Sequence, residues 1–404
     1  MVDSRGTPKI LVVAAEASGD MHAARVVRQV SRLRPEVEFY GIGGDAMAEA
    51  GVHLVYHARD LAVVGISEIL SRAVPISRAL GWVRRTLLAD RPDLAVLVDF
   101  PDFNLRAARH AVKARVPVVY YISPQIWAWR RGRIRQIRRT VSKMLVIFPF
   151  EEELYKRHGV PAEWVGHPLM DAWQERDRAS SEAQFLEHET FGLSPLYPVV
   201  GLLPGSRASE VRSLLPTILE AAQLLRQRHP HVQFLLFEAP GLPEDLFSES
   251  LRRADLPVVR ARSEAGRAMP LCDIAVVASG TATLELALHG IPMVVVYKVS
   301  RATFLLGRLL VRVPSIALVN LVCGRPVVPE LLQGELDARN LAGLCHDLLT
   351  RSLYRSEMKR TLSQVPILLG PPGASERAAR AIVAVLDPWG SRPEDRPNEG
   401  EVLR

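Results

Sequence analysis

The chain has 404 residues, 48% hydrophobic and 24% charged, with a net charge of +7, a composition typical of a folded protein with room for two domains. Its three cysteines lack paired spacing, so we expect neither a disulfide framework nor a structural zinc site, and a reducing compartment. Because residues 1–6 lack the apolar core of a signal peptide and no apolar run approaches the roughly 20 residues of a spanning helix, we expect no membrane span.

Short apolar segments of strand type alternate with segments of helical period along most of the chain, which predicts parallel α/β sheets. The polar residues 174–190 interrupt this alternation and predict a connection between two α/β halves. In such a fold the expected site is a cleft between the carboxyl ends of the two sheets. The predicted strands are residues 10–14, 95–98, 118–122 and 144–147 in the first half, and 199–203, 233–236, 274–278 and 293–297 in the second.

The end of the chain departs from the alternation. A Gly-Pro-Pro-Gly turn at 370–373 precedes an alanine-rich helix pattern at 375–386, and the polar residues 388–404 are predicted to be disordered. The predicted divisions are an N-terminal domain at 1–172, a linker at 173–195, a C-terminal domain at 196–369, a helix at 370–387 and a tail at 388–404.

The first strand-end loop, residues 16–20, reads Glu-Ala-Ser-Gly-Asp and leads into a helix. Its backbone amides and Ser18 are suited to hold an anion or a sugar hydroxyl. The alternative is a helix N-cap with a tight turn, since capping residues occur at nearly every helix start.

The second loop, residues 99–104, carries two carboxylates, Asp99 and Asp102, after a strand of almost continuous hydrophobicity. A carboxylate aimed into a cleft can take the proton of an attacking hydroxyl. Aspartate also commonly caps a helix or initiates a turn, and the two interpretations stand level. Asp99, nearest the strand end, is the better candidate base.

The third loop, residues 203–207, combines a glycine that permits close backbone approach with Ser206 and Arg207. The guanidinium of Arg207 offers a fork of donors to phosphate oxygens, which suits a leaving diphosphate. The alternative is a turn with an exposed arginine, and the phosphate-binding pattern GxxxxGK[ST] is absent.

The fourth loop, residues 279–285, opens a helix with the small residues Ser279, Gly280 and Thr281. The amino end of a helix favours anions, and Glu285, one turn along, is placed to accept hydrogen bonds from ribose hydroxyls. A well-capped buried helix is the alternative.

His167 is interpreted as structural, and the absence of metal-ligand spacing predicts no metal site and no cofactor.

Basic residues alternate with apolar ones in several segments. Six arginines fall within residues 130–139, and residues 301–312 and 63–88 interleave arginines with leucine, isoleucine, phenylalanine or tryptophan. This pattern favours an anionic lipid surface as partner. For residues 63–88 a core helix with a solvated basic face is an equally weighted alternative.

Eight stretches in order resemble the lipid-A-disaccharide synthase family, whose members have two Rossmann-like halves of the GT-B type. The ordered set is highly specific and covers most of the chain. The matching stretches are residues 16–20, Asp99 with 101–104, 123–130 (SPQIWAWR), 148–151 (FPFE), 166–168 (GHP), 203–207 with Glu210, 278–285 (ASGTATLE), and Asn320 with 324–325.

The resemblance implies an α/β fold of the GT-B type, with two Rossmann-like domains whose parallel sheets face a central cleft. It implies inverting transfer of 2,3-diacylglucosamine from its UDP derivative to the 6-hydroxyl of 2,3-diacylglucosamine 1-phosphate, without a metal. It further implies a membrane-facing acceptor domain at the N-terminus, a UDP-sugar domain at the C-terminus, and a cytoplasmic enzyme peripheral on the inner face of the cytoplasmic membrane.

The resemblance also assigns roles to residues. Asp99 is the catalytic base and Arg207 the catalytic cation at the leaving diphosphate. The residues implied to bind substrate are Glu16, Ser18, Asp20, Asp102, Asn104, Ser206, Ser279, Gly280, Thr281, Glu285 and Asn320.

The chain departs from the family pattern at two loops. Ala15 precedes Glu16 where the family usually has glycine, and residues 317–320 read Ala-Leu-Val-Asn instead of Ser-Leu-Pro-Asn. Neither departure removes a residue assigned to the chemical step, although either can alter substrate preference.

Two rival functions remain at this stage. The first is another UDP-sugar enzyme, such as a cell-wall glucosaminyltransferase or an epimerase. The stretches at residues 99–104 and 123–130 count against this function. A noncatalytic RNA-binding protein would fit the pI of about 9.5 and the arginine run, but leaves the four strand-end loops unexplained. We therefore expect no nucleic-acid partner, and a homodimer is left open.

Overall fold

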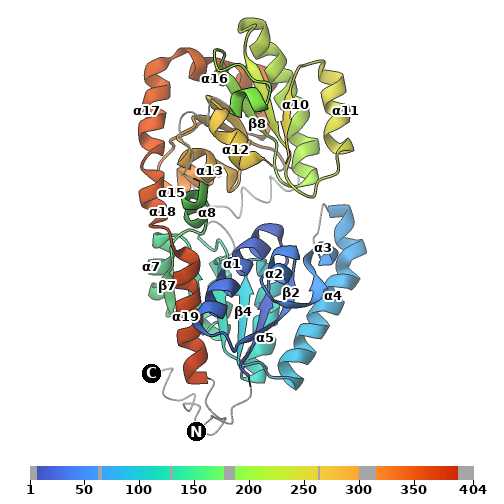
Figure 1. The fold of residues 1–404 in the computed structure, drawn as a ribbon, viewed down its shortest axis with the longest axis vertical. Helices are drawn as coiled ribbons and strands as arrows, with labels where there is room; N and C mark the ends of the chain where they lie inside the picture. Colours follow the sequence, from blue (N-terminus) through green and yellow to red (C-terminus); the bar gives the residue numbers. More distant parts are fainter. Residues whose placement is uncertain are drawn as a thin grey trace. The chain divides into compact units, whose positions relative to one another are not determined.

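The computed structural model describes residues 7–61, 66–127, 131–176, 187–262, 264–299 and 315–389. The chain divides into two compact units (Figure 1). Unit 1 comprises Met1–Asp171 and Pro371–Arg404, and unit 2 comprises Ala172–Gly370. The basic segment at 301–312 that we predicted to favour lipid lies outside the described residues.

Within the described residues, unit 1 contains a seven-stranded parallel sheet in the order β3-β2-β1-β4-β5-β6-β7. Four predicted strands are confirmed to within one residue, as β1 (Lys9–Val13), β4 (Leu94–Val98), β5 (Val118–Tyr121) and β6 (Lys143–Val146). The strands that we did not predict are β2 (Glu38–Gly43), β3 (His53–His57) and β7 (Ala162–Trp164).

Helices cover both faces of this sheet, and side-chain alternation divides the strands between them. Val12, Val96 and Val98 face α1 (Ala17–Leu33) and α19 (Ala374–Trp389), which lie side by side. Leu11, Val13 and Leu97 belong to the core on the other face. The other helices in the described part of unit 1 are α2 (Asp45–Glu49), α3 (Ala58–Leu61), α4 (Ile66–Ala89), α5 (Pro101–Ala114), α6 (Ile134–Thr140), α7 (Pro149–Arg157) and the start of α8 (Leu169–Arg176), with a 3-10 turn at Arg131–Arg133.

Helix α4 contains most of the segment 63–88, for which we weighed lipid docking against core packing. In its second half Leu87 is buried, and Leu80 and Trp82 pack against the core. Arg84 and Arg85 are exposed on the other side. The described half therefore favours the packing alternative, while the side chains of residues 60–73 lie outside the description.

Unit 2 holds a six-stranded parallel sheet in its described part, in the order β10-β9-β8-β11-β12-β13. Four predicted strands are confirmed, as β8 (Val199–Leu203), β9 (Gln233–Phe237), β11 (Ile274–Ala278) and β12 (Met293–Tyr297). Two strands of three residues, β10 (Val259–Ala261) and β13 (Glu330–Leu332), were not predicted.

The helices of unit 2 flank this sheet, and α10 packs against α11 and α16. Besides the end of α8, the described part of unit 2 contains α10 (Ala208–Arg228), α11 (Asp245–Ala254), α12 (Ala265–Ala268), α13 (Ala282–Leu288), α15 (Leu318–Val322), α16 (Ala338–Thr350), α17 (Ser352–Leu362) and α18 (Val365–Leu369), with 3-10 turns at Met269–Leu271 and Gln333–Glu335.

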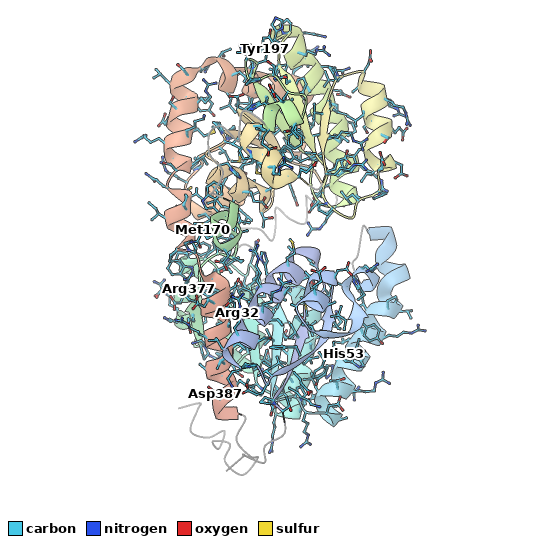
Figure 2. All side chains as sticks on the ribbon, viewed as in Figure 1. Arg32, His53, Met170, Tyr197, Arg377 and Asp387 are labelled. Carbon is cyan, nitrogen blue, oxygen red and sulfur yellow. The ribbon has the colours of Figure 1, made fainter. Side chains whose placement is uncertain are left out.

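The chain returns to unit 1 at α19, and two side chains fasten it there. Asp171 accepts hydrogen bonds from the backbone N–H groups of residues 373, 374 and 375, at 2.7, 3.0 and 2.9 Å, and so caps the helix. Arg377, labelled in Figure 2, donates to the carbonyl oxygens of Val165, Pro371 and Pro372. The helix includes residues 388 and 389, which we had predicted to be disordered; the remainder of that tail lies outside the described residues.

We expect Asp171→Ala to lower the free energy of unfolding by about 2 kcal/mol, because it leaves the N–H groups at the start of α19 without their acceptor. Denaturant unfolding, together with hydrogen exchange of the α19 amides, measures the effect. Asp387→Ala is the matched control, since it removes only a surface pair with Arg34 at the other end of the helix. Equal losses in the two variants would contradict this account.

Candidate active site

The loops that follow β1, β4, β5 and β6 lie at one edge of the unit 1 sheet, because these parallel strands are neighbours in that order. Backbone bonds connect the loops directly. The N–H of Asp99 donates to the carbonyl of Tyr121 at 3.0 Å, and the N–H of Ile122 donates to the carbonyl of Leu145 at 3.1 Å.

The turn after β4 has an unusual backbone. Asp99 and Phe100 both have positive φ, 47° and 44°, although neither is glycine, and such residues keep this conformation only where their surroundings enforce it. The Tyr120 hydroxyl donates to the Asp99 carbonyl at 2.5 Å. The Asn104 amide donates to the carbonyls of Val98 and Asp99 at 3.0 and 2.8 Å. Asn104 is 0% exposed, so its amide braces the turn that carries Asp99.

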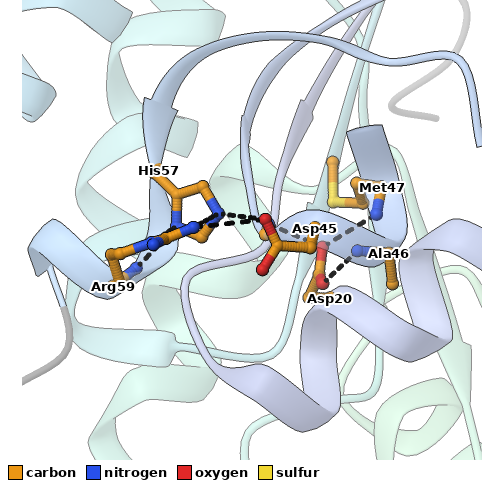
Figure 3. Close-up of polar contacts among 7 residues, drawn as sticks. Asp20, Asp45, Ala46, Met47, His57 and Arg59 are labelled. Atoms are coloured by element: carbon orange, nitrogen blue, oxygen red, sulfur yellow. Dashed lines mark hydrogen bonds and ion pairs between the residues drawn. The ribbon is translucent and has the colours of Figure 1, made fainter. Parts of the chain in front are cut away.

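The opening loop has a similar brace. The carboxylate of Asp20 is buried and accepts hydrogen bonds from the N–H groups of Gly44, Ala46 and Met47, at 2.6, 3.0 and 3.1 Å (Figure 3). Asp20 lies in the first turn of α1, and its contacts join that turn to the start of α2. Ser18, in the same turn, is exposed, and Glu16, which precedes the helix, is half-buried.

Asp102 lies in the first turn of α5 and forms an ion pair with Arg133. Arg133 belongs to the run of arginines at 130–139. One member of that basic run therefore has a carboxylate partner on a strand-end loop of the same unit.

A buried carboxylate to which we assigned no role follows β6. Glu151 is 1% exposed and accepts hydrogen bonds from the Ser123 hydroxyl at 2.7 Å, the Trp127 indole N–H at 3.0 Å and the Phe148 backbone N–H at 3.3 Å. Burial raises the pKa of this carboxyl to about 7, because desolvation of the charged form outweighs the hydrogen bonds that favour it. The sequence signal was the stretch FPFE, in which glutamate sits at the third position of a helix.

The raised pKa of Glu151 makes the stability of the protein depend on pH. The unfolded chain ionises near 4.5 and the folded protein near 7, so this group contributes stability below pH 4.5 that is lost as pH rises toward 7. Relative to Glu151→Gln, we expect wild type to lose about 2–3 kcal/mol between pH 5 and pH 8. Urea unfolding of both proteins across that range gives the difference, in which the titration of other groups cancels. A difference independent of pH would contradict the expectation.

In unit 2, the loop after β8 is shaped by Glu210. Its carboxylate accepts hydrogen bonds from the N–H groups of Ser206 and Arg207, at 3.1 and 3.3 Å, and pairs with the Arg207 guanidinium at 3.0 Å. Gly205 has a φ of 117°, and a Cβ there would lie 2.4 Å from the Glu210 carboxylate. The Arg207 side chain is 60% exposed, so a cation is presented at the carboxyl end of β8.

The loop after β11 lies beside it, because β8 and β11 are paired strands. The Ser279 hydroxyl donates to the carbonyl of Ile316 at 2.9 Å. Gly280 and Glu285 are half-buried and Thr281 is exposed. Ser206, Arg207 and these four residues are therefore gathered at the end of two adjacent strands.

Asn320 is buried and serves as another brace. Its side-chain oxygen accepts from the N–H groups of Val327 and Val328, at 2.7 and 3.0 Å. Its amide donates to the carbonyl of Val328 and to the Glu330 carboxylate, at 3.0 and 2.8 Å. These contacts hold the turn between α15 and β13.

The described residues contain no group of three or more histidines, cysteines, aspartates and glutamates arranged to hold a metal ion. Within the same residues, no helix combines the length and apolarity that crossing a bilayer requires.

Solved structures share this fold over nearly the whole chain. UDP-GlcNAc 2-epimerase from Neisseria meningitidis bound to UDP-GlcNAc is similar with a TM-score of 0.65 at 12% identity, covering 93% of this chain and 100% of that one. A glycosyltransferase from Rickettsia africae ESF-5 is similar with a TM-score of 0.57 at 10% identity, covering 94% and 99%. The fold is the α/β fold of the GT-B class, as predicted.

Sequence comparison gives the family. The model of the family described as lipid-A-disaccharide synthetase matches residues 10–370. Lipid-A-disaccharide synthase of Geobacter sulfurreducens is 44% identical over 381 residues, 94% of this chain and 97% of that protein, and the enzyme of Syntrophus aciditrophicus is 45% identical over 371 residues, 92% and 96%. The chain belongs to the lipid-A-disaccharide synthase family and is a glycosyltransferase of lipid A biosynthesis. The two rival functions are thereby set aside.

Proposed function

We propose that the chain transfers 2,3-diacylglucosamine from UDP-2,3-diacylglucosamine to the 6-hydroxyl of 2,3-diacylglucosamine 1-phosphate. The products are UDP and the β-1,6-linked lipid A disaccharide 1-phosphate, with inversion at the anomeric carbon. The observation that carries the proposal is the braced turn at Asp99, because its strained backbone is maintained by buried hydrogen bonds at a strand end. Support for a UDP-sugar donor comes from the family and from the UDP-GlcNAc-bound epimerase of the same fold.

Asp99 is the general base in this proposal. Its carboxylate takes the proton of the acceptor 6-hydroxyl while that oxygen attacks the anomeric carbon of the donor. A single displacement of this kind inverts the anomeric centre. Glu16, Ser18 and Asp102 bind the acceptor, whereas Asp20 and Asn104 act by holding their loops.

Arg207 stabilises the departing UDP. Its guanidinium compensates the negative charge that develops on the diphosphate, and Glu210 fixes its position through an ion pair. Ser206, Ser279, Gly280 and Thr281 supply hydrogen-bond donors to the phosphates, and Glu285 accepts from the ribose hydroxyls. This arrangement offsets the leaving-group charge without a metal ion. Asn320 contributes by bracing the turn between α15 and β13.

The acylated substrates lead to the remaining proposals. Unit 1 binds the acceptor and faces the membrane, and unit 2 binds the UDP-sugar. Since both substrates reside in a bilayer, the protein works as a peripheral enzyme at the anionic inner face of the cytoplasmic membrane, to which its net charge of +7 attracts it. The absence of a nucleic-acid partner stays a prediction, and homodimer formation is left open.

We expect Asp99→Asn to lower kcat by about a hundredfold or more while the donor KM changes little, because the amide cannot take the proton. Disaccharide formation from the two substrates is measured in EDTA. Asp90→Asn, which changes an exposed aspartate in the connection between α4 and β4, is the matched control and should retain wild-type rates. Failure of the wild type to form disaccharide under any detergent or metal condition would overturn the proposed function.

We expect Arg207→Ala to weaken UDP binding about tenfold or more, because it removes a charged hydrogen-bond donor from the diphosphate. Calorimetry of UDP binding measures this without turnover. Arg212→Ala, an exposed arginine on the same helix α10, serves as the control. Unchanged UDP affinity in Arg207→Ala would remove Arg207 from the donor site.

A further inference from the structure

Four aromatic rings form a continuous row at the carboxyl ends of β5, β6 and β7 in unit 1. Trp127 meets Phe150 edge to face with ring centroids 5.3 Å apart, and Phe150 stacks on Phe148 at 5.5 Å with an interplanar angle of 6°. Phe148 in turn contacts His167 at 5.3 Å. Phe148 and His167 are buried, while Phe150 is 39% exposed, so the row runs from the core to the surface.

The buried end of the row is rigid. The His167 Nδ1 accepts a hydrogen bond from the Leu169 N–H at 3.1 Å, which places the proton on Nε2. Burial lowers the pKa of this imidazole to about 3, so the ring is neutral near pH 7. The buried end of the row, next to which the exposed rings pack, is therefore rigid and uncharged.

Glu151 fixes the exposed end. Its carboxylate accepts hydrogen bonds from Trp127 and Ser123, on the loop after β5, and from the Phe148 N–H. The same loop contains Ile122 with a φ of 63°, a conformation that is a genuine outlier for a β-branched residue. A buried carboxylate and a strained backbone both cost free energy, and together they hold Trp127 beside Phe150.

The row lies at the edge of the sheet that carries Asp99. Strand β5 is the neighbour of β4, and β6 is the neighbour of β5, so at about 4.8 Å per strand the carboxyl ends of β5 and β6 lie about 5 and about 10 Å from that of β4. The backbone bonds of Asp99 to Tyr121 and of Ile122 to Leu145 join the three loops. The loops that carry the row and the turn that carries Asp99 are therefore adjacent at one edge of the sheet.

We propose that Trp127 and Phe150 form the binding platform for the acylated aminosugar acceptor, and that Glu151 is the positioning residue that keeps the two rings together. The proposal rests on the proposed function, since it takes the acceptor to be the molecule deprotonated by Asp99. The C–H-rich face of a pyranose and the first methylenes of an acyl chain are apolar, and an aromatic face removes them from water without requiring a charge. Unit 2 carries the diphosphate-binding loops, which leaves the acceptor for unit 1.

The first test is steady-state kinetics with each substrate varied in turn, in detergent micelles. We expect Phe150→Ala to raise the acceptor KM about tenfold, as loss of one ring's apolar contact implies, while the donor KM stays within about twofold. Phe150→Tyr keeps the ring and should restore the acceptor KM. Tyr354→Ala, which removes a comparably exposed aromatic on α17 of unit 2, is the control.

The second test reads the platform without turnover. In protein labelled with ¹⁵N-tryptophan, the Trp127 indole resonance is assigned by its loss in Trp127→Phe. We expect it to shift in Glu151→Gln, which weakens its acceptor, and in wild type on addition of 2,3-diacylglucosamine 1-phosphate alone. The control is Glu152→Gln, which removes the charge of the neighbouring glutamate that pairs with Lys156. It should leave the Trp127 resonance unshifted.

An exposed aromatic side chain can also contact the bilayer interface. A third measurement, flotation with anionic vesicles, tests this alternative. Reduced vesicle binding of Phe150→Ala with an unchanged acceptor KM would assign the ring to the membrane and overturn the platform. Equal rises in both KM values, or no shift of the Trp127 resonance with acceptor, would overturn it as well. Each of these outcomes overturns the platform only when the wild type is active. If the wild type forms no disaccharide, the proposed function itself has failed, which is a separate result.

Discussion

The site depends on buried polar side chains that satisfy the backbone of strand-end loops. A loop at the carboxyl edge of a parallel sheet has N–H and C=O groups that neither the strand nor the following helix uses, and leaving such groups buried without partners is costly. Asp20 and Glu210 supply acceptors for N–H groups, and Asn104 supplies a donor for carbonyls. Glu151 and Asn320 do the same for neighbouring loops. The loops can therefore hold conformations that their own residues disfavour, as at Asp99 and Ile122.

These braces explain what could be predicted of the site. Strand-end loops of apolar strands are recognisable in a sequence, and both sheets bring them together as expected. A polar side chain in such a loop can point toward a ligand or toward its own backbone, and the two cases have the same residue types. Asp20, Asn104 and Asn320 belong to the second case, and composition alone contains no information that separates them from Ser18 or Arg207. Glu151 was missed for the related reason that a single glutamate after Pro-Phe is usually a helix residue exposed to water.

The limits of strand prediction have a different origin. Central strands such as β4 and β11 are buried on both faces and read as unbroken apolar runs. Edge strands such as β3 are partly exposed, and β7, β10 and β13 have only three residues, too few for a period to be recognised. The return of α19 to unit 1 could not be read from sequence either. Two side chains hold it there, Asp171 and Arg377. Their hydrogen bonds go to residues about 200 positions away or to the carbonyl oxygens of prolines, and no local sequence pattern predicts such hydrogen bonds.

The positions of the residues with positive φ indicate what the strained turns provide. Asp99 with Phe100, and Ile122, lie after adjacent strands, and each costs about 1–3 kcal/mol relative to a relaxed backbone. Glycine would relieve the strain, but it would also widen the range of conformations open to the loop. In the function and platform that we propose, the base and the aromatic rings must keep their separation to within a fraction of an ångström for one acceptor to engage both, which a uniquely determined turn provides better than a relaxed one. The strain is thus tolerated where the buried hydrogen bonds of Tyr120, Asn104 and Glu151 are concentrated.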